Sequence, residues 1–285
     1  MGRVGRAQSL RAIAAALDGG ITHFDVARLY GYGEAEALVG EALAGKRDKV
    51  VIASKFGLTP NRAAGAFRSL KPIAQRIAAT VPGARAVLRS MVGGAAQAAD
   101  RFSVTSAEAS LAQSLAALKT DYLDILFLHD CAADDLSDEL AAFLDRQVAA
   151  GKIRAYGVAT DIDAVLPLCA KHGDAMLYQF PSSIAVPNAE RLPNGGRRFI
   201  AHSPFADRAR VAARLNGMVP SGDVHRAMLA HALAAPDVAV VLCSMLDETH
   251  LRANLDAVEN PRFSAEQIAQ FAAMATEPSV RKPAA

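Results

Sequence analysis

Four ionisable side chains in this sequence are placed where they could move protons. Asp25, Lys55 and His129 each stand at or near the end of a short apolar segment, and Tyr30 follows Asp25 by five residues. Taken singly, each has an ordinary explanation as a helix cap, a surface residue or a structural histidine. Successive parallel strands deliver their ends to one edge of a sheet, so the conjunction favours a catalytic site.

The types of these residues suit the reduction of a carbonyl group. A tyrosine has a pKa of about 10, and a nearby ammonium group stabilises the phenolate and lowers that value. We therefore expect Lys55 to lower the pKa of Tyr30, and Asp25 to pair with the lysine and fix its position. Tyr30 then acts as general acid on a carbonyl oxygen, to which His129 also hydrogen-bonds. No side chain stores a hydride, so a cofactor must supply it.

Short apolar segments alternate with amphipathic helical patterns over the whole length of the chain. This alternation predicts a parallel sheet, and its even spacing favours a (β/α)8 TIM barrel, of class α/β, as a single domain over residues 1–285. No GxGxxG segment follows a strand, which weighs against a doubly wound dinucleotide-binding fold. The predicted strands are 21–25, 49–56, 122–129, 153–160, 175–180, 198–204 and 238–244.

The beginning of the chain does not supply the first strand of such a barrel. The first clear element is a helix over about 8–17, preceded only by "MGRVGRA". We therefore expect the N-terminal hairpin and first strand to be absent. A barrel with an open seam exposes unpaired strand edges. Self-association or a partner strand is the expected means of covering them.

A basic insertion interrupts the alternation at about residues 58–104. It has two interpretations: a lid that guides an anionic substrate or cofactor phosphates, or a helical excursion with its charges in solvent. The helix that follows is expected to begin with a capping box formed by Thr105 and Glu108. The charged residues of the insertion are Arg62, Arg68, Lys71, Arg76, Arg85, Arg89 and Arg101, against Asp100.

Composition excludes several classes of function. A net charge of +2 gives no general case for nucleic-acid binding. Cys131, Cys169 and Cys243 are widely spaced, so neither a disulfide framework nor a metal site is indicated. The chain shows no signal-peptide core and no run near the roughly 20 apolar residues that a membrane helix needs. A cytoplasmic protein without nucleic-acid or membrane partners is expected.

Four segments resemble the aldo-keto reductase family. They are "GITHFDVARLYGYGEAEALVGEAL", "VVIASKFG", "SLAALKTDYLDILFLHD" and "GKIRAYGVAT", and the resemblance extends from about Gly20 to Val258. It implies a (β/α)8 barrel that reduces carbonyls with NADPH or NADH. By residue-to-residue match it implies the same catalytic residues, and it favours Tyr30 over Tyr32 as the acid, with Tyr32 lining the substrate pocket.

The resemblance also implies a set of cofactor contacts. Two of them depart from the family pattern: Ala159-Thr160 replaces Ser-Asn, and His202 replaces a tyrosine that stacks on nicotinamide. The family slightly favours NADPH, whereas the residues do not decide, because Leu246 or His250 stands where a basic residue often binds the 2′-phosphate. The implied contacts are Thr160, Gln179, His202, Ser203, Phe205, Ser244 and Asn254.

These observations predict an NAD(P)H-dependent oxidoreductase that interconverts an alcohol and an aldehyde, ketone or sugar. Two alternatives remain open. One is a nicotinamide-binding, non-catalytic barrel that acts as a sensor or partner subunit, and the other is an N-terminally truncated inactive form. The sequence does not name the substrate, because specificity in a barrel lies in its loops.

Overall fold

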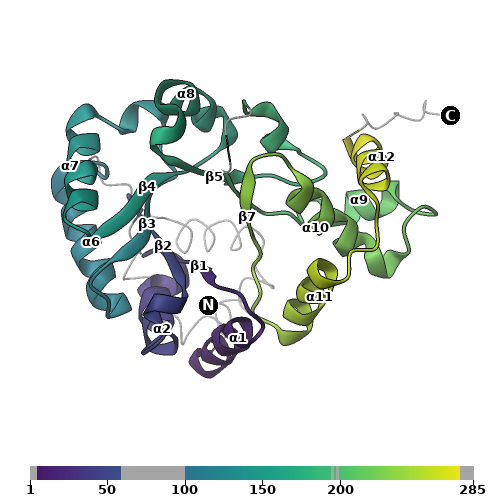
Figure 1. Cartoon of the computed structure of the whole chain (residues 1–285), viewed down its shortest axis with the longest axis horizontal. Helices are drawn as coiled ribbons and strands as arrows, with labels where there is room; N and C mark the ends of the chain where they lie inside the picture. The colour runs from purple at the N-terminus through teal and green to yellow at the C-terminus, as the bar shows by residue number, and fades with distance from the viewer. Residues whose placement is uncertain (1–4, 59–99, 194–195, 197–198, 277–285) are drawn as a thin grey trace, which may run out of the picture. The chain divides into compact units, whose positions relative to one another are not determined.

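The computed structural model describes residues 5–58, 100–193, 196 and 199–276. The chain divides into two compact units, the first being Met1–Gly157 and the second Val158–Ala285. In each, helices and strands alternate along the chain (Figure 1). That the whole chain forms one domain stays a prediction.

The first unit holds the strands that carry the predicted catalytic residues. β1, β2 and β3 pair in parallel, with His23 beside Val51 and Ala53 beside Ile125. The strands are β1 (His23–Asp25), β2 (Val51–Phe56), β3 (Leu123–His129) and most of β4 (Ile153–Ala159). The helices are α1 (Arg6–Asp18), α2 (Ala35–Ala42), α6 (Val104–Leu118) and α7 (Asp138–Ala149), with shorter 3-10 turns η1 (Tyr30–Gly33), η2 (Arg47–Lys49) and η4 (Ala133–Asp135).

β2 and β3 are buried almost throughout, as expected for parallel strands covered on both faces. Their inaccessible side chains, among them Phe56, Phe127 and Leu126, form the core of this unit. Helices α6 and α7 lie along the outer side of these strands (Figure 1). The strand ends are therefore held by a rigid, packed layer.

Close packing between α2 and α6 explains one glycine. A Cβ atom at Gly40 would lie 2.4 Å from the carbonyl oxygen of Leu118, so any other residue would push the two helices apart. The predicted capping box at the start of α6 is wrong. The helix begins one residue before Thr105, and the Ser103 hydroxyl caps it by accepting from the backbone N–H of Ser106 at 3.2 Å.

In the second unit, β5 pairs with β6 and β6 with β7 in parallel. Helix α10 packs against β7 and against the three helices α9, α11 and α12. A buried cluster that includes Ile184, Met228 and Phe271 fills the space between them. The elements are β5 (Leu177–Pro181), β6 (Phe199–His202), β7 (Val238–Leu242), α8 (Ile162–His172), α9 (Arg208–Arg214), α10 (Val224–Ala234), α11 (Glu248–Glu259), α12 (Ala265–Thr276), η5 (Gly173–Ala175), η6 (Asn188–Arg191) and η7 (Ser221–Asp223).

All predicted strands are confirmed, and their order in the sheet follows the chain, from β1 to β7. The predicted first helix is also confirmed as α1. Residues 1–4, which belong to the segment before α1 in which no first strand was predicted, lie outside the described residues. Residues 59–99, which hold most of the basic insertion, lie outside them as well. Within the described ranges, no helix is long and apolar enough to cross a membrane.

Candidate functional site

The ends of β1 and β2 bring Asp25 and Lys55 into contact. Asp25 lies beside Ala53 in the parallel register, and Lys55 is two residues further along the same face of β2. The Lys55 side chain is buried, and its Nζ donates to Asp25 Oδ1 and to the carbonyl oxygen of Val26 at 3.2 Å. The lysine is thus fixed by the strand and loop that lead to Tyr30.

Burial lowers the pKa of Lys55, and the Asp25 carboxylate opposes this effect by its charge and its hydrogen bond. A lysine this far from water would otherwise tend to lose its proton. Asp25 therefore favours the charged form of Lys55 and orients its ammonium group.

Tyr30 lies on η1, directly after the loop that leaves β1. Its backbone N–H donates to the carbonyl oxygen of Ala27 at 2.9 Å. Gly31 and Gly33 adopt φ angles of 62° and 93°, which the tight turn requires and which glycine reaches without strain. The turn sets the Tyr30 ring with its centroid 5.1 Å from Lys55 Nζ. Tyr30 remains 39% exposed, so it is accessible to a ligand.

The structure corrects the expected effect of Lys55 on Tyr30. Burial, and after it the nearby Asp25 carboxylate, raise the pKa of Tyr30 to about 12. The prediction that the ammonium lowers this pKa is wrong, because the charge of Lys55 is balanced by Asp25 and the carboxylate disfavours a second negative charge. The phenol consequently keeps its proton at neutral pH, which is the state that a proton donor needs.

His129 completes the group from the end of β3. Its ring meets the Tyr30 ring edge to face, with centroids 5.8 Å apart and planes at 89°. The next residue, Asp130, has a left-handed φ of 56°, and Arg101 donates to its carbonyl oxygen at 2.9 Å. Asp25, Tyr30, Lys55 and His129 therefore lie together within the first unit, as a buried ion pair next to a phenol and an imidazole.

The predicted cofactor contacts all fall in the second unit, several of them at strand ends. The backbone N–H of Thr160, after β4, donates to the carbonyl oxygen of Gln179 in β5 at 3.0 Å, and both residues are buried. At the end of β6, His202 Nδ1 lies 2.9 Å from Ser203 Oγ. Ser203 is exposed and has a φ of 59°, and Phe205 packs on the core of this unit.

The remaining predicted contacts follow β7. Ser244 is exposed, and Asn254 is half-buried on α11, where His250 lies one turn earlier on the same face. An amide, hydroxyls and imidazoles fit a nicotinamide and ribose hydroxyls by hydrogen bonding. The predicted set contains no arginine or lysine for a 2′-phosphate. The Tyr32 side chain lies outside the side chains that the structure describes.

The sequence reasoning passed over two polar residues next to this group. Glu36 on α2 and Ser54 on β2 are both buried and hydrogen-bonded to each other. The available signal was a serine inside an otherwise apolar strand, directly before Lys55, and a glutamate in the buried face of a helix.

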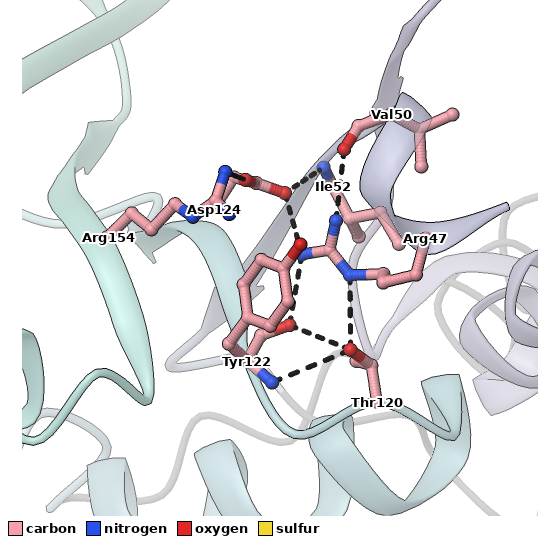
Figure 2. Close-up of polar contacts among 7 residues, drawn as sticks. All are labelled: Arg47, Val50, Ile52, Thr120, Tyr122, Asp124 and Arg154. Atoms are coloured by element: carbon pink, nitrogen blue, oxygen red, sulfur yellow. Dashed lines mark hydrogen bonds and ion pairs between the residues drawn. The ribbon is translucent and has the colours of Figure 1, made fainter.

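A second polar cluster lies at the opposite ends of the same strands (Figure 2). The buried carboxylate of Asp124 accepts from Arg47 Nη2 at 2.6 Å, Arg154 Nη1 at 2.8 Å and the backbone N–H of Ile52 at 2.9 Å. The Tyr122 ring stacks with both guanidinium groups, at 3.8 Å from Arg47 and 4.5 Å from Arg154. Clusters at the amino ends of barrel strands typically stabilise the fold rather than act on substrates.

Comparison with known sequences gives a consistent assignment. A model of the Aldo/keto reductase family matches residues 1–191. The methylglyoxal reductase of Escherichia coli (strain K12) is 27% identical over 250 residues, which cover 82% of this chain and 69% of that protein. The 6-dehydroglucose reductase of Novosphingobium aromaticivorans is 31% identical over 163 residues, 53% of this chain and 41% of that protein.

Solved structures agree on the fold. An aldo-keto reductase from Bacillus halodurans in its holo form superposes with a TM-score of 0.71 at 21% identity, covering 96% of this chain and 88% of that one. An aldo-keto reductase from Klebsiella pneumoniae in complex with NADPH gives a TM-score of 0.63 at 22% identity, covering 99% and 90%. The predicted α/β class and (β/α)8 barrel fold are confirmed.

Proposed function

Because the chain belongs to the aldo/keto reductase family, which groups NAD(P)-dependent oxidoreductases, we propose that it interconverts a carbonyl compound and an alcohol by hydride transfer. The observation that carries the proposal is the gathering of Tyr30, Lys55, Asp25 and His129 at the ends of three neighbouring strands. These are the groups that proton transfer to a carbonyl oxygen requires.

In the proposed reaction, Tyr30 is the general acid. As the carbonyl carbon accepts a hydride, negative charge develops on its oxygen, and the phenol delivers its proton there. His129, whose ring lies edge to face with Tyr30, donates a hydrogen bond to the same oxygen and orients it. Because burial and the Asp25 carboxylate keep the pKa of Tyr30 raised, the phenol enters the reaction with a proton to donate, and the Asp25–Lys55 pair holds the ammonium group 5.1 Å from the centroid of its ring.

A bound reduced nicotinamide supplies the hydride. We propose NADPH, because the similar protein of Klebsiella pneumoniae was crystallised with it. Thr160, Gln179 and His202 are the proposed contacts of the nicotinamide. Ser203, Phe205, Ser244 and Asn254 are the proposed contacts of the remainder of the dinucleotide. NADH remains the alternative, because the predicted contacts contain no arginine or lysine for a 2′-phosphate.

The proposed substrates are small aldehydes, ketones or sugars. Relatives named for the reduction of methylglyoxal and 6-dehydroglucose support this class. The partly exposed Tyr30 ring leaves an approach for a compact carbonyl group, and no single compound within the class is assigned.

Steady-state kinetics with each reduced nicotinamide and a panel of carbonyls tests the proposal, with the oxidation of the cofactor followed by its absorbance. Tyr30→Phe is expected to lower kcat by about 10²- to 10⁴-fold, the range that general acid catalysis supplies. Tyr156→Phe is the matched control, since Tyr156 also has a pKa raised to about 12 but bonds to Asp145 on α7.

Undiminished turnover in Tyr30→Phe would refute the proposed acid. Binding of the nicotinamide, seen by fluorescence, without turnover of any carbonyl would instead support the sensor or partner-subunit alternative. That result would leave the fold and the cofactor assignment standing and remove the catalytic one.

A further inference from the structure

The segment that carries Tyr30 is fastened to β2 at two neighbouring residues. Where the segment begins, the backbone N–H of Val26 donates to the carbonyl oxygen of Ala53 at 2.9 Å. Past Tyr30, on α2, the carboxylate oxygen Oε1 of Glu36 accepts from Ser54 Oγ at 2.6 Å. The next residue of β2 is Lys55, so the two attachments and the lysine are consecutive along one strand.

The alternation of side chains along β2 explains why Ser54 and Lys55 contact different elements. Successive side chains of a strand point to opposite faces, so Ser54 faces α2 while Lys55 faces Asp25. Between the two attachments the chain has little freedom. Tyr30 N–H donates to the Ala27 carbonyl oxygen at 2.9 Å, and Glu34 N–H donates to the Gly31 carbonyl oxygen at 3.3 Å.

Stability alone does not account for the Glu36–Ser54 pair. Glu36 is 3% exposed and Ser54 is 0% exposed, and burying a carboxylate is costly. The buried Asp124 carboxylate accepts from two arginines, whereas Glu36 forms no ion pair with any described residue. The first turn of α2 favours a negative charge, which offsets part of the cost. Two apolar side chains of similar size would fill the same space without the cost of burying a carboxylate.

We infer that Glu36 and Ser54 are positioning residues that hold the Tyr30 hydroxyl in register with the Lys55 ammonium group. The inference rests on the proposed function, because it concerns the geometry of the proposed proton donor. Displacement of a reacting group by about 1 Å lowers turnover by about 10²-fold, so a short, directional contact made six residues after Tyr30 has a measurable effect.

The test replaces both partners with apolar side chains of similar size, as Glu36→Met combined with Ser54→Ala. We expect kcat to fall by about 30- to 100-fold, while KM and the dissociation constant of the nicotinamide stay within about threefold. The thermal midpoint should stay within about 3 °C of the wild type, because no buried polar group is left unpaired.

Two single variants make the result specific. Glu36→Gln keeps an acceptor oxygen for Ser54 and is expected to retain kcat within about threefold. Glu41→Met is the matched control, because it removes another carboxylate of α2, one that is exposed and pairs with Arg6. It should leave kcat unchanged.

Each outcome bears on the inference. A double variant with wild-type kcat, or a kcat loss that tracks the unfolded fraction, overturns the positioning role. If the double variant does not fold, Glu36→Gln decides, and a loss of kcat in that variant also overturns it. If the wild-type chain shows no turnover, the proposed function itself is refuted. If Tyr30→Phe lowers kcat but the Glu36→Met, Ser54→Ala double variant does not, only this inference is refuted.

Discussion

The parallel strands of the first unit carry a charged cluster at each end, and the two clusters differ in how many partners their buried charge has. At the amino ends, Asp124 accepts from two guanidinium groups and a backbone N–H, and Tyr122 stacks with both arginines (Figure 2). At the carboxyl ends, Lys55 has one carboxylate partner, Asp25, and burial lowers its pKa.

We interpret the amino-end cluster as stabilising the fold and the carboxyl-end cluster as serving the proposed reaction. A buried charge with several donors around it gains enough to offset its desolvation, and it holds the strands in register. A buried charge with a single opposite charge beside it is held at a cost, and such groups concentrate where a reaction uses them. Each end also carries a phenol: Tyr122 is half-buried and stacks with two arginines, whereas Tyr30, beside Lys55, is 39% exposed.

The largest expected effect comes from removing the carboxyl-end pair as a unit. Asp25→Asn with Lys55→Met should lower kcat by about 10⁴-fold, equivalent to about 5 kcal/mol in the barrier. Stability should change by less than about 1.5 kcal/mol, because no single charge is left buried. Turnover and urea unfolding of the same preparation measure both quantities. A large loss of stability with retained kcat would reverse the assignment of this end to chemistry.

The amino-end cluster should respond in the opposite sense. Asp124→Ala removes the opposite charge from Arg47 and the acceptor of the Ile52 N–H, and the free energy of unfolding should fall by about 3 to 4 kcal/mol. The kcat of the protein that remains folded should stay within about threefold of the wild type. Urea unfolding curves together with active-site-normalised turnover check this. A loss below about 1 kcal/mol would show that the cluster is not the stabilising one.

Within that cluster, the two arginines should differ according to their exposure. The Arg47 side chain is 19% exposed and the Arg154 side chain 63% exposed. Arg47→Ala should lower the free energy of unfolding by about 2 kcal/mol, because Arg47 also donates to the carbonyl oxygens of Val50 and Tyr122. Arg154→Ala should lower it by less than about 1 kcal/mol, as for an exposed ion pair. Equal effects in paired urea experiments would mean that burial does not set the value of these contacts.

Much of the fold could be predicted from the sequence because β/α alternation is local. Apolar runs such as 122–129 have few alternatives to a buried strand, and Asp25, Lys55 and His129 stand at the ends of such runs. The start of α6 was mispredicted because Ser103 and Thr105 are both good caps, and packing rather than sequence decides between them.

The electrostatics of the site could not be predicted in the same way. The direction of the Tyr30 pKa shift depends on burial and on the distance from the phenol to Asp25, and neither is written in residue spacing. The Glu36–Ser54 contact joins residues from a helix and a strand whose relative rotation only the packed structure fixes. The ionisable groups at the strand ends and the Asp25–Lys55 pair were predicted from the sequence, whereas the net effect of that pair on the pKa of Tyr30 was not.

The smallest effect concerns His23, which lies on β1 between the two clusters. Burial lowers the pKa of His23, and among the smaller influences Asp25 and Asp124 raise it while Lys55 lowers it. Its Nε2 is buried and has no hydrogen-bond partner among the described residues. His23 thus faces charges from both ends of the strands, and its protonation reports on their balance.

A histidine whose pKa is lower in the folded state binds its proton more readily when unfolded. The free energy of unfolding should therefore decrease as pH falls below about 6.5, the value for an unfolded histidine, with a slope of at most about 1.4 kcal/mol per pH unit. The decrease should stop once the pH passes below the pKa of His23 in the folded protein. In His23→Leu this share of the pH dependence should disappear, whereas His250→Leu, at an exposed position of α11, should retain it. Urea unfolding of the three proteins across pH 5 to 8 measures the difference. If wild type and His23→Leu lose stability in parallel, the charges at the two ends of the strands do not meet at His23, and the clusters act independently.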